Sequence, residues 1–240
     1  MVIKSRELEY QHENANLKAY MAWDDSTQEQ RPMVLSCHDA MGANSDFQHG
    51  RAKALAKLGY VGFALDVYGD GKHANNAQEA YQQMEPFISD REFLRRRLLS
   101  AIEAASDLPE VDEKKIAAIG YCFGGLCALD LARSGAPLKG IVSFHGTLSA
   151  SDTVAAKPVS SKILVQHGWS DPLVPIDQVI EFTAEMNALK ADWEFVGYGG
   201  TMHSFTNPDA NNPEIGIAYS KTADHRSWLR MSSFLTEVFV

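Results

Sequence analysis

Short apolar runs alternate with longer segments of helical spacing along most of the chain, and this alternation limits the folds open to it. Short runs rich in Val, Ile, Leu and Phe are typical of buried strands. Strands that alternate with helices predict an α/β fold, with a mostly parallel central sheet and helices on both of its faces. The expected strands are 17–23, 32–37, 61–65, 116–119, 140–144, 162–166 and 193–198, and the expected helices are 47–58, 77–88, 92–108, 122–133, 176–189 and a last one within 215–239.

The length of the chain, 240 residues, suits one large domain with a well-buried core. No internal repeat, low-complexity tract or Pro/Gly-rich linker interrupts it, so we expect residues 1–240 to form a single α/β domain. An irregular segment rich in Gly, Asn and Asp covers residues 68–76. With the helix that follows, residues 68–88 are a candidate lid.

Net charge and cysteine content limit the function classes. With a formal charge of −9, the surface repels nucleic acid and anionic membrane, so neither is an expected partner. We find no apolar segment of signal-peptide or membrane-spanning length. The three cysteines, Cys37, Cys122 and Cys127, do not suggest a disulfide framework. We therefore expect a cytoplasmic protein with reduced thiols, either a monomer or a small homo-oligomer.

The segment Gly120-Tyr121-Cys122-Phe123-Gly124-Gly125 joins a predicted strand directly to a predicted helix. It fits the G-x-nucleophile-x-G pattern of a sharp strand-to-helix turn, with Cys in the usual Ser position. Glycines two residues before and after the nucleophile remove side chains that would collide in this turn. The helix N-terminus favours a thiolate at Cys122, and the N–H of Phe123 is placed to bind an oxyanion. The alternative is a Gly-rich turn around a buried structural cysteine, the role that we expect for Cys127.

A catalytic triad also needs an acid and a histidine later in the chain, in that order. Asp171 follows the predicted strand 162–166, and His203 follows the next strand in a glycine-flanked loop. Because the carboxyl ends of parallel strands meet at one edge of the sheet, both side chains can reach Cys122. Taken singly, Asp171 could be a turn aspartate before proline and His203 a surface histidine. The order and position of all three favour a triad.

The segment His38-Asp39-Ala40-Met41-Gly42 follows the strand predicted at 32–37. The second oxyanion donor of such a site comes from the loop after an early strand, so the N–H of Ala40 is the candidate.

Three histidines, His38, His145 and His167, each end a strand-like run and raise the question of a metal site near Asp39 or Asp171. No H-x-H or H-E-x-x-H spacing accompanies them. We therefore expect histidines that support loops through hydrogen bonds, with no metal and no cofactor.

Taken together, the segment Gly120–Gly125, the His167-Gly-x-x-Asp171-Pro-x-Val-Pro segment and Gly200-Thr-Met-His203-Ser-Phe205 resemble the dienelactone hydrolase family. The resemblance extends from about residue 17 to the end of the chain. It implies the α/β-hydrolase fold, a Cys–His–Asp triad, and hydrolysis of an ester or lactone through a thioester acyl-enzyme without a cofactor or metal.

The resemblance also implies residues around the nucleophile. An acidic residue in the oxyanion loop of such enzymes contacts the resting cysteine, and Asp39 matches it. Two arginines bind the substrate carboxylate in members that cleave dienelactone, but Asp70 and Asn207 occupy the positions aligned with them, and neither can clamp a carboxylate. We therefore expect a different substrate. The candidate substrate-binding residues are Tyr68, Lys72 and Phe205.

The expected function is hydrolysis of a small carboxylic ester or lactone, the activity of a carboxylesterase or lactonase. One alternative is a thioesterase or a general short-chain carboxylesterase, which leaving-group preference would separate from a lactonase. Another is a non-catalytic thiol sensor on the same fold, because a cysteine at a helix N-terminus can be oxidised reversibly.

Overall fold

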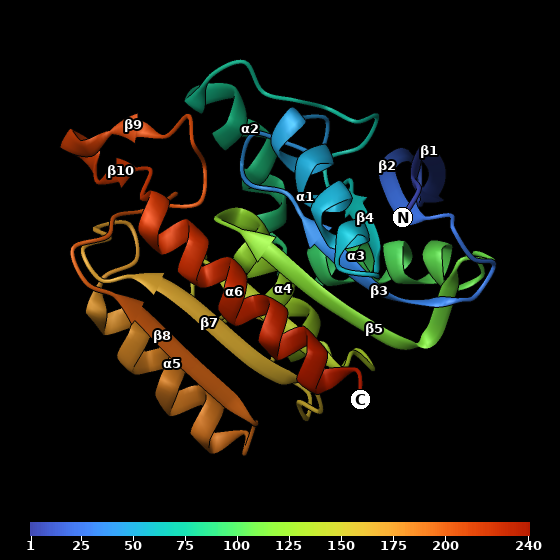
Figure 1. Cartoon of the computed structure of the whole chain (residues 1–240). Coiled ribbons are helices and arrows are strands. Elements are labelled where there is room, and N and C mark those ends of the chain that lie inside the picture. Colours follow the sequence, from blue (N-terminus) through green and yellow to red (C-terminus); the bar gives the residue numbers. More distant parts are fainter. The chain divides into compact units, whose positions relative to one another are not determined.

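The computed structural model describes all 240 residues, and Figure 1 labels their helices and strands. The chain divides into two compact units, Met1–Ala118 and Ile119–Val240. Strand β5 (Val111–Tyr121) crosses the boundary and so contributes residues to both units. The single domain expected over residues 1–240 stays a prediction.

The strands of the first unit follow the order β1-β2-β4-β3-β5. β1 and β2 form an antiparallel pair, β2 is antiparallel to β4, and β3 is parallel to β4. The strand expected at 17–23 is therefore the second of a hairpin whose first strand, β1, was not predicted. The elements are β1 (Ile3–His12), β2 (Ala15–Asp24), β3 (Arg31–Cys37), α1 (Asp46–Lys57), β4 (Val61–Leu65), α2 (Ala77–Ser89) and α3 (Arg91–Ser106).

The strands of the second unit follow the order β5-β6-β7-β8, and the pairs β6–β7 and β7–β8 are parallel. The elements are α4 (Phe123–Arg133), β6 (Gly140–Phe144), β7 (Lys162–Gly168), α5 (Ile176–Ala188), β8 (Trp193–Tyr198) and α6 (Lys221–Val238). A short hairpin, β9 (Asn211–Asn212) and β10 (Ile217–Ala218), encloses a 3₁₀ turn (Pro213–Ile215) between β8 and α6. This hairpin was not predicted.

Strand β6 shows how the helices cover both faces of the sheet in this unit. A Cβ placed on Gly140 would lie 2.8 Å from the ring of Phe234 in α6, whereas Ser143 Oγ lies 2.5 Å from the Cβ position of Gly125 in α4. Residues 140 and 143 point to opposite faces because side chains alternate along a strand. Helices α4 and α6 therefore lie on opposite faces (Figure 1), and the predicted fold class is confirmed.

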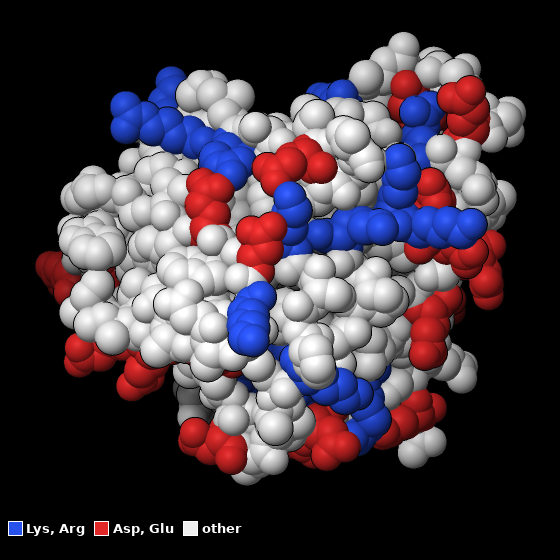
Figure 2. All heavy atoms as spheres, turned by 90° about the horizontal axis from the view of Figure 1, so that it is seen from below, with Lys and Arg blue, Asp and Glu red and all other residues white.

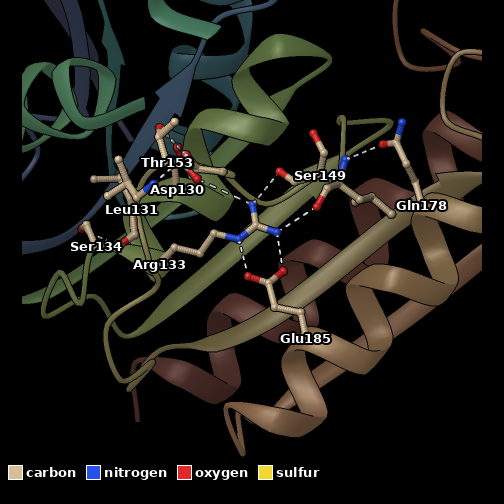
Figure 3. A network of polar contacts seen from close by, with 11 residues as sticks. Asp130, Leu131, Arg133, Ser134, Ser149, Thr153, Gln178 and Glu185 are labelled. Atoms are coloured by element: carbon tan, nitrogen blue, oxygen red, sulfur yellow. Dashed lines mark hydrogen bonds and ion pairs between the residues drawn. The ribbon is translucent and has the colours of Figure 1, made fainter. Parts of the chain in front are cut away.

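Helix α4 is fixed to α5 and to the loop after β6 by Arg133, whose side chain is 1% exposed (Figure 3). The guanidinium donates to both carboxylate oxygens of Glu185, at 2.9 and 2.7 Å. It also donates to the carbonyl oxygens of Leu148 and Ser149, at 2.8 and 3.2 Å. These bonds hold the C-terminal end of α4, the helix whose N-terminus follows the predicted nucleophile.

Charged side chains of both signs are interspersed on the face drawn in Figure 2. Basic side chains have acidic ones beside them there, so this face offers no continuous basic surface to a phosphate backbone. None of the helices combines the length and apolar character that crossing a membrane requires.

Candidate active site

Cys122 lies between β5 and α4 with a left-handed φ of 55° and a ψ of −116°. Residues with a side chain rarely adopt this backbone geometry, which is typical of strained functional turns. Steric crowding explains why the motif has glycine at position 120, because a Cβ there would lie 1.8 Å from the carbonyl oxygen of Gly124. The N–H of Cys122 donates to the carbonyl of Phe144 at 3.1 Å, which attaches the turn to the end of β6.

The three cysteines differ in exposure. Cys37 and Cys127 are buried, whereas Cys122 is partly exposed, and all three are free thiols. Cys122 is also the N-cap of α4, and no side chain caps that helix end. Cys122 therefore combines accessibility with the helix N-terminus that favours a thiolate, and Cys127 lies in the core as expected.

His203 bridges Cys122 and Asp171 within the second unit. Its Nδ1 lies 2.7 Å from Asp171 Oδ2, and both side chains are buried. The His203 ring also hydrogen-bonds with the side chain of Cys122. The structure thus brings together the three side chains that the sequence proposes as nucleophile, base and acid.

The charges around His203 determine its protonation. Burial lowers the pKa of His203, but the charge of Cys122, the hydrogen bonds with Asp171 and Cys122, and the charge of Asp171 outweigh burial and raise the pKa to about 10. At neutral pH the His203 ring is therefore protonated and lies beside the side chain of Cys122. A cationic imidazole next to a cysteine is the arrangement that activates a cysteine nucleophile.

Asp171 uses its two carboxylate oxygens for different partners. Oδ2 faces His203, while Oδ1 accepts the N–H groups of Leu173 at 2.8 Å and Val174 at 3.3 Å. The two interpretations of Asp171 from the sequence, a turn aspartate before proline and a partner of histidine, therefore both describe the structure. Each interpretation applies to a separate oxygen.

The ring of His145, directly after β6, packs against His203 and joins it to the aromatic side chains nearby. The ring of His145 meets the His203 ring edge-on at a centroid distance of 5.1 Å, and His145 Nε2 lies 2.8 Å from Thr206 Oγ1. Phe205 has no exposed surface and packs against His145 and Tyr198 at 5.0 and 5.4 Å. Phe205 therefore packs within the loop that carries His203, and its expected role as a substrate contact stays a prediction.

Phe123 is the first residue of α4, directly after Cys122, and its role as an oxyanion donor stays a prediction. The other predicted site residues lie in the first unit, where two loops meet. Asp39 Oδ1 accepts the N–H of Met41 at 2.9 Å, and the hydroxyl of Tyr68 donates to the carbonyl of Ala40 at 3.0 Å. Lys72 belongs to the same loop as Tyr68, and its side chain is exposed. The expected roles stay predictions: Asp39 as nucleophile contact, Ala40 as oxyanion donor, and Tyr68 and Lys72 as substrate contacts.

His38 supports these two loops through both of its ring nitrogens. Its Nδ1 donates to the carbonyl of Asp39 at 2.6 Å, and its Nε2 accepts the N–H of Val67 at 3.2 Å. Burial lowers the pKa of His38, which agrees with a neutral ring that donates and accepts at once. No cluster of three or more His, Cys, Asp or Glu side chains is arranged to hold a metal ion.

Known proteins are similar to this chain over most or all of its length. The model of the dienelactone hydrolase family matches residues 17–239. A protein of Caenorhabditis elegans is 38% identical over 149 residues, which are 61% of this chain and 94% of that protein. The crystal structure of a dienelactone hydrolase-like promiscuous phosphotriesterase from metagenomic libraries is 37% identical, with a TM-score of 0.95 over 100% of both chains.

A more distant structure shares the fold. The dienelactone hydrolase of Anabaena variabilis is 17% identical and has a TM-score of 0.73 over 100% of both chains. The family match covers nearly the entire chain and includes Cys122, Asp171 and His203. The chain therefore belongs to the dienelactone hydrolase family, a family of hydrolases with the α/β-hydrolase fold.

Proposed function

We propose that this protein is a cysteine-dependent hydrolase that cleaves a carboxylic ester or lactone through a thioester acyl-enzyme. The observation that carries the proposal is the position of His203, which bonds to Asp171 on one side and to Cys122 on the other. In this proposal Cys122 is the nucleophile, His203 is the general acid and base, and Asp171 holds the His203 ring in one tautomer. A reducing cytoplasm, the predicted location, would keep the thiol active.

In the acylation step, the Cys122 sulfur attacks the carbonyl carbon of the substrate. Negative charge develops on the carbonyl oxygen, for which the N–H groups of Phe123 and Ala40 are the proposed donors. One such donor contributes about 3–4 kcal/mol to the transition state. The intermediate then expels the alkoxide, which takes the proton of His203, and a thioester remains on Cys122.

In the deacylation step, His203 changes from acid to base. Acylation removes the charge and the hydrogen bond of Cys122, which are two of the causes that raise the pKa of His203. The ring is then neutral and accepts a proton from water while the water oxygen attacks the thioester. The sulfur of Cys122 leaves as the thiolate, the carboxylic acid is released, and His203 carries the proton taken from water.

The substrate is proposed to be an uncharged ester or lactone. Asp70 is exposed and acidic, and Asn207 is an amide, so neither supplies the cation that a substrate carboxylate needs. The leaving alkoxide of a lactone stays attached to the acyl group, so it can attack the thioester and reverse the acylation. A stabilised leaving group, such as an enolate, attacks less readily and therefore favours completion of the reaction.

A second candidate reaction is phosphotriester hydrolysis. It is supported by the 37% identity and TM-score of 0.95 to a structure described as a promiscuous phosphotriesterase. The same thiolate would attack phosphorus in place of carbon. Release of p-nitrophenolate from diethyl p-nitrophenyl phosphate would measure this activity beside the ester reaction.

The experiment compares two cysteine variants in the hydrolysis of p-nitrophenyl butyrate. Cys122→Ala removes the proposed nucleophile, whereas Cys127→Ala changes a buried cysteine on the same helix. We expect Cys122→Ala to lower kcat/KM by at least about 10³-fold, while Cys127→Ala keeps most of the activity. Equal activity in the two variants would overturn the proposal. A wild type without turnover, in which Cys122 is oxidised reversibly, would support the thiol sensor.

A further inference from the structure

The hairpin of β9 and β10 lies mostly outside the core. Residues 211–215 are all exposed, and Gly216 is the one buried residue between 211 and 218. Burial of apolar surface is what usually fixes a surface segment, and this hairpin has little of it. Its defined shape therefore has to come from the contacts that Gly216 and its neighbours make.

Those contacts go to the chain on both sides of the proposed acid and base. The N–H of His203 donates to the carbonyl of Gly216 at 2.9 Å, and the N–H of Ala218 donates to the carbonyl of His203 at 3.1 Å. His203 thus forms a parallel bridge with Ile217. Both backbone polar groups of His203, the N–H and the carbonyl, are therefore hydrogen-bonded to the hairpin.

Gly216 also presses against the residue that follows Asp171. Its φ is +80°, and a Cβ at this position would lie 2.1 Å from Cγ and 2.3 Å from Cδ of Pro172. A side chain is therefore disfavoured twice, by the left-handed backbone and by the proline ring. The close approach is possible because Gly216 has no side chain.

We infer that Gly216 is a positioning residue, and that the hairpin 211–218 acts as a clamp that sets the distance between Asp171 and His203. The inference rests on the proposed function, in which Asp171 and His203 act together. Gly216 touches neither substrate nor reacting atoms. It joins the Asp171-Pro172 turn to the His203 backbone, two segments that are far apart in the sequence. Displacing either segment would lengthen the 2.7 Å contact between Oδ2 and Nδ1.

A double-mutant cycle tests the clamp through the contact between residues 216 and 172. Gly216→Ala adds the Cβ that meets the proline ring, and Pro172→Ala removes the Cγ and Cδ atoms that it would meet. The remaining Cβ of residue 172 lies 3.6 Å away, an ordinary contact. We expect Gly216→Ala to lower kcat for p-nitrophenyl butyrate by roughly 10- to 100-fold with little change in KM. In the Pro172→Ala background the same change should lower kcat by less than about threefold.

A second readout does not depend on turnover. The Nδ1 proton of His203, shared with Asp171, is expected at low field in the proton NMR spectrum, and Asp171→Asn identifies it by its loss. Gly216→Ala should weaken or remove this signal, and the double variant should restore it. If Gly216→Ala does not fold, Ala218→Pro replaces it, because it removes the N–H donated to His203 without a clash at Pro172.

The outcomes separate the clamp from the proposed function. Folded Gly216→Ala with the kcat and NMR signal of the wild type would overturn the clamp. A double variant no better than Gly216→Ala would also overturn it, as would Ala218→Pro with unchanged kcat and signal. If Cys122→Ala is as active as the wild type, the proposed function fails, and the NMR comparison still decides whether the hairpin positions His203.

Discussion

Asp171 Oδ2 lies 2.7 Å from His203 Nδ1, and the exposed fractions of the two side chains are only 0% and 5%. A charge-assisted hydrogen bond of this length in a buried setting holds the imidazole in one orientation and one tautomer. The other oxygen of Asp171 holds the turn that carries it. The functional contact and the local fold of Asp171 are therefore separable by substitution.

Asp171→Asn and Asp171→Ala are expected to differ in stability but not in activity. Asn keeps an oxygen for the N–H groups of Leu173 and Val174, but it cannot accept the His203 proton at Oδ2 as a carboxylate does. We expect both variants to lose about 10³- to 10⁴-fold in kcat. Only Asp171→Ala should also lose about 1–2 kcal/mol of unfolding free energy. Urea unfolding and steady-state kinetics check both, and full activity in Asp171→Asn would exclude Asp171 as the orienting acid.

Gly120→Ala is expected to destabilise the protein strongly. The added Cβ would lie 1.8 Å from the carbonyl oxygen of Gly124, a clash with backbone that cannot be relieved by a rotamer change. We expect a loss of at least about 3 kcal/mol in urea unfolding. Gly199→Ala is the matched control, because a Cβ there has nothing within 4 Å, and it should change stability by less than about 0.5 kcal/mol. Similar losses in the two variants would contradict the steric account of the turn.

The pH dependence of kcat/KM should follow the protonation of His203. Its pKa is raised from 6.5 to about 10, so the proton needed by the leaving alkoxide is present at neutral pH and is lost as the pH rises through about 10. We expect kcat/KM to fall on that alkaline side. The interactions of protonated His203 with Cys122 and Asp171 also stabilise the folded state. This contribution to the free energy of unfolding is fully present below pH 6.5 and is lost as the pH rises from 6.5 to about 10.

An NMR titration of His203 in Cys122→Ala checks the cause of this shift. The variant removes the charge and hydrogen bond of Cys122, two of the causes that raise the pKa of His203. Its midpoint should therefore lie below that of the wild type. An unchanged midpoint would show that Cys122 does not interact with His203.

Arg133 is expected to be important for stability but not for chemistry. Its buried guanidinium is bonded to Glu185 and to two carbonyl groups. Arg133→Ala removes these bonds and leaves the carboxylate of Glu185 without its cation, so it should cost about 3–5 kcal/mol in urea unfolding. Arg133→Lys keeps the charge but not the two-pronged geometry, so it should recover only part of the loss. If kcat of the folded Arg133 variants falls by more than the loss of folded protein accounts for, a purely structural role of Arg133 would be contradicted.

The fold could be predicted where a strand is apolar and closed by turn residues. β4, β6 and β8 occupy the predicted ranges because Gly, Pro or charged residues end each apolar run. β1 was missed because its sequence is mostly polar and only Tyr10 is buried. For β5 only 116–119 was predicted, because residues 112–115 of the strand are polar and none of them is buried. Hydrogen bonds with neighbouring strands, and not apolar pattern, define such segments.

The site residues that belong to local sequence motifs could be predicted from the sequence. The positions of Cys122, Asp171 and His203 followed from their places after strands, and the structure brings the three together. The role of Gly216 has no local signal, because a positive φ and an approach to Pro172 depend on segments distant in sequence. Phe205 is predicted as a substrate contact from the family resemblance; its side chain is buried in the loop, and the substrate contact stays a prediction.

Mass spectrometry of the protein seconds after mixing with p-nitrophenyl butyrate tests the central claim most directly. The proposed mechanism predicts a mass increase of one butyryl group on the peptide that contains Cys122, absent from Cys122→Ala and accumulating in His203→Gln if acylation continues. An acyl group on any other residue, or turnover by Cys122→Ala at the rate of the wild type, would contradict the assignment of Cys122 as the nucleophile.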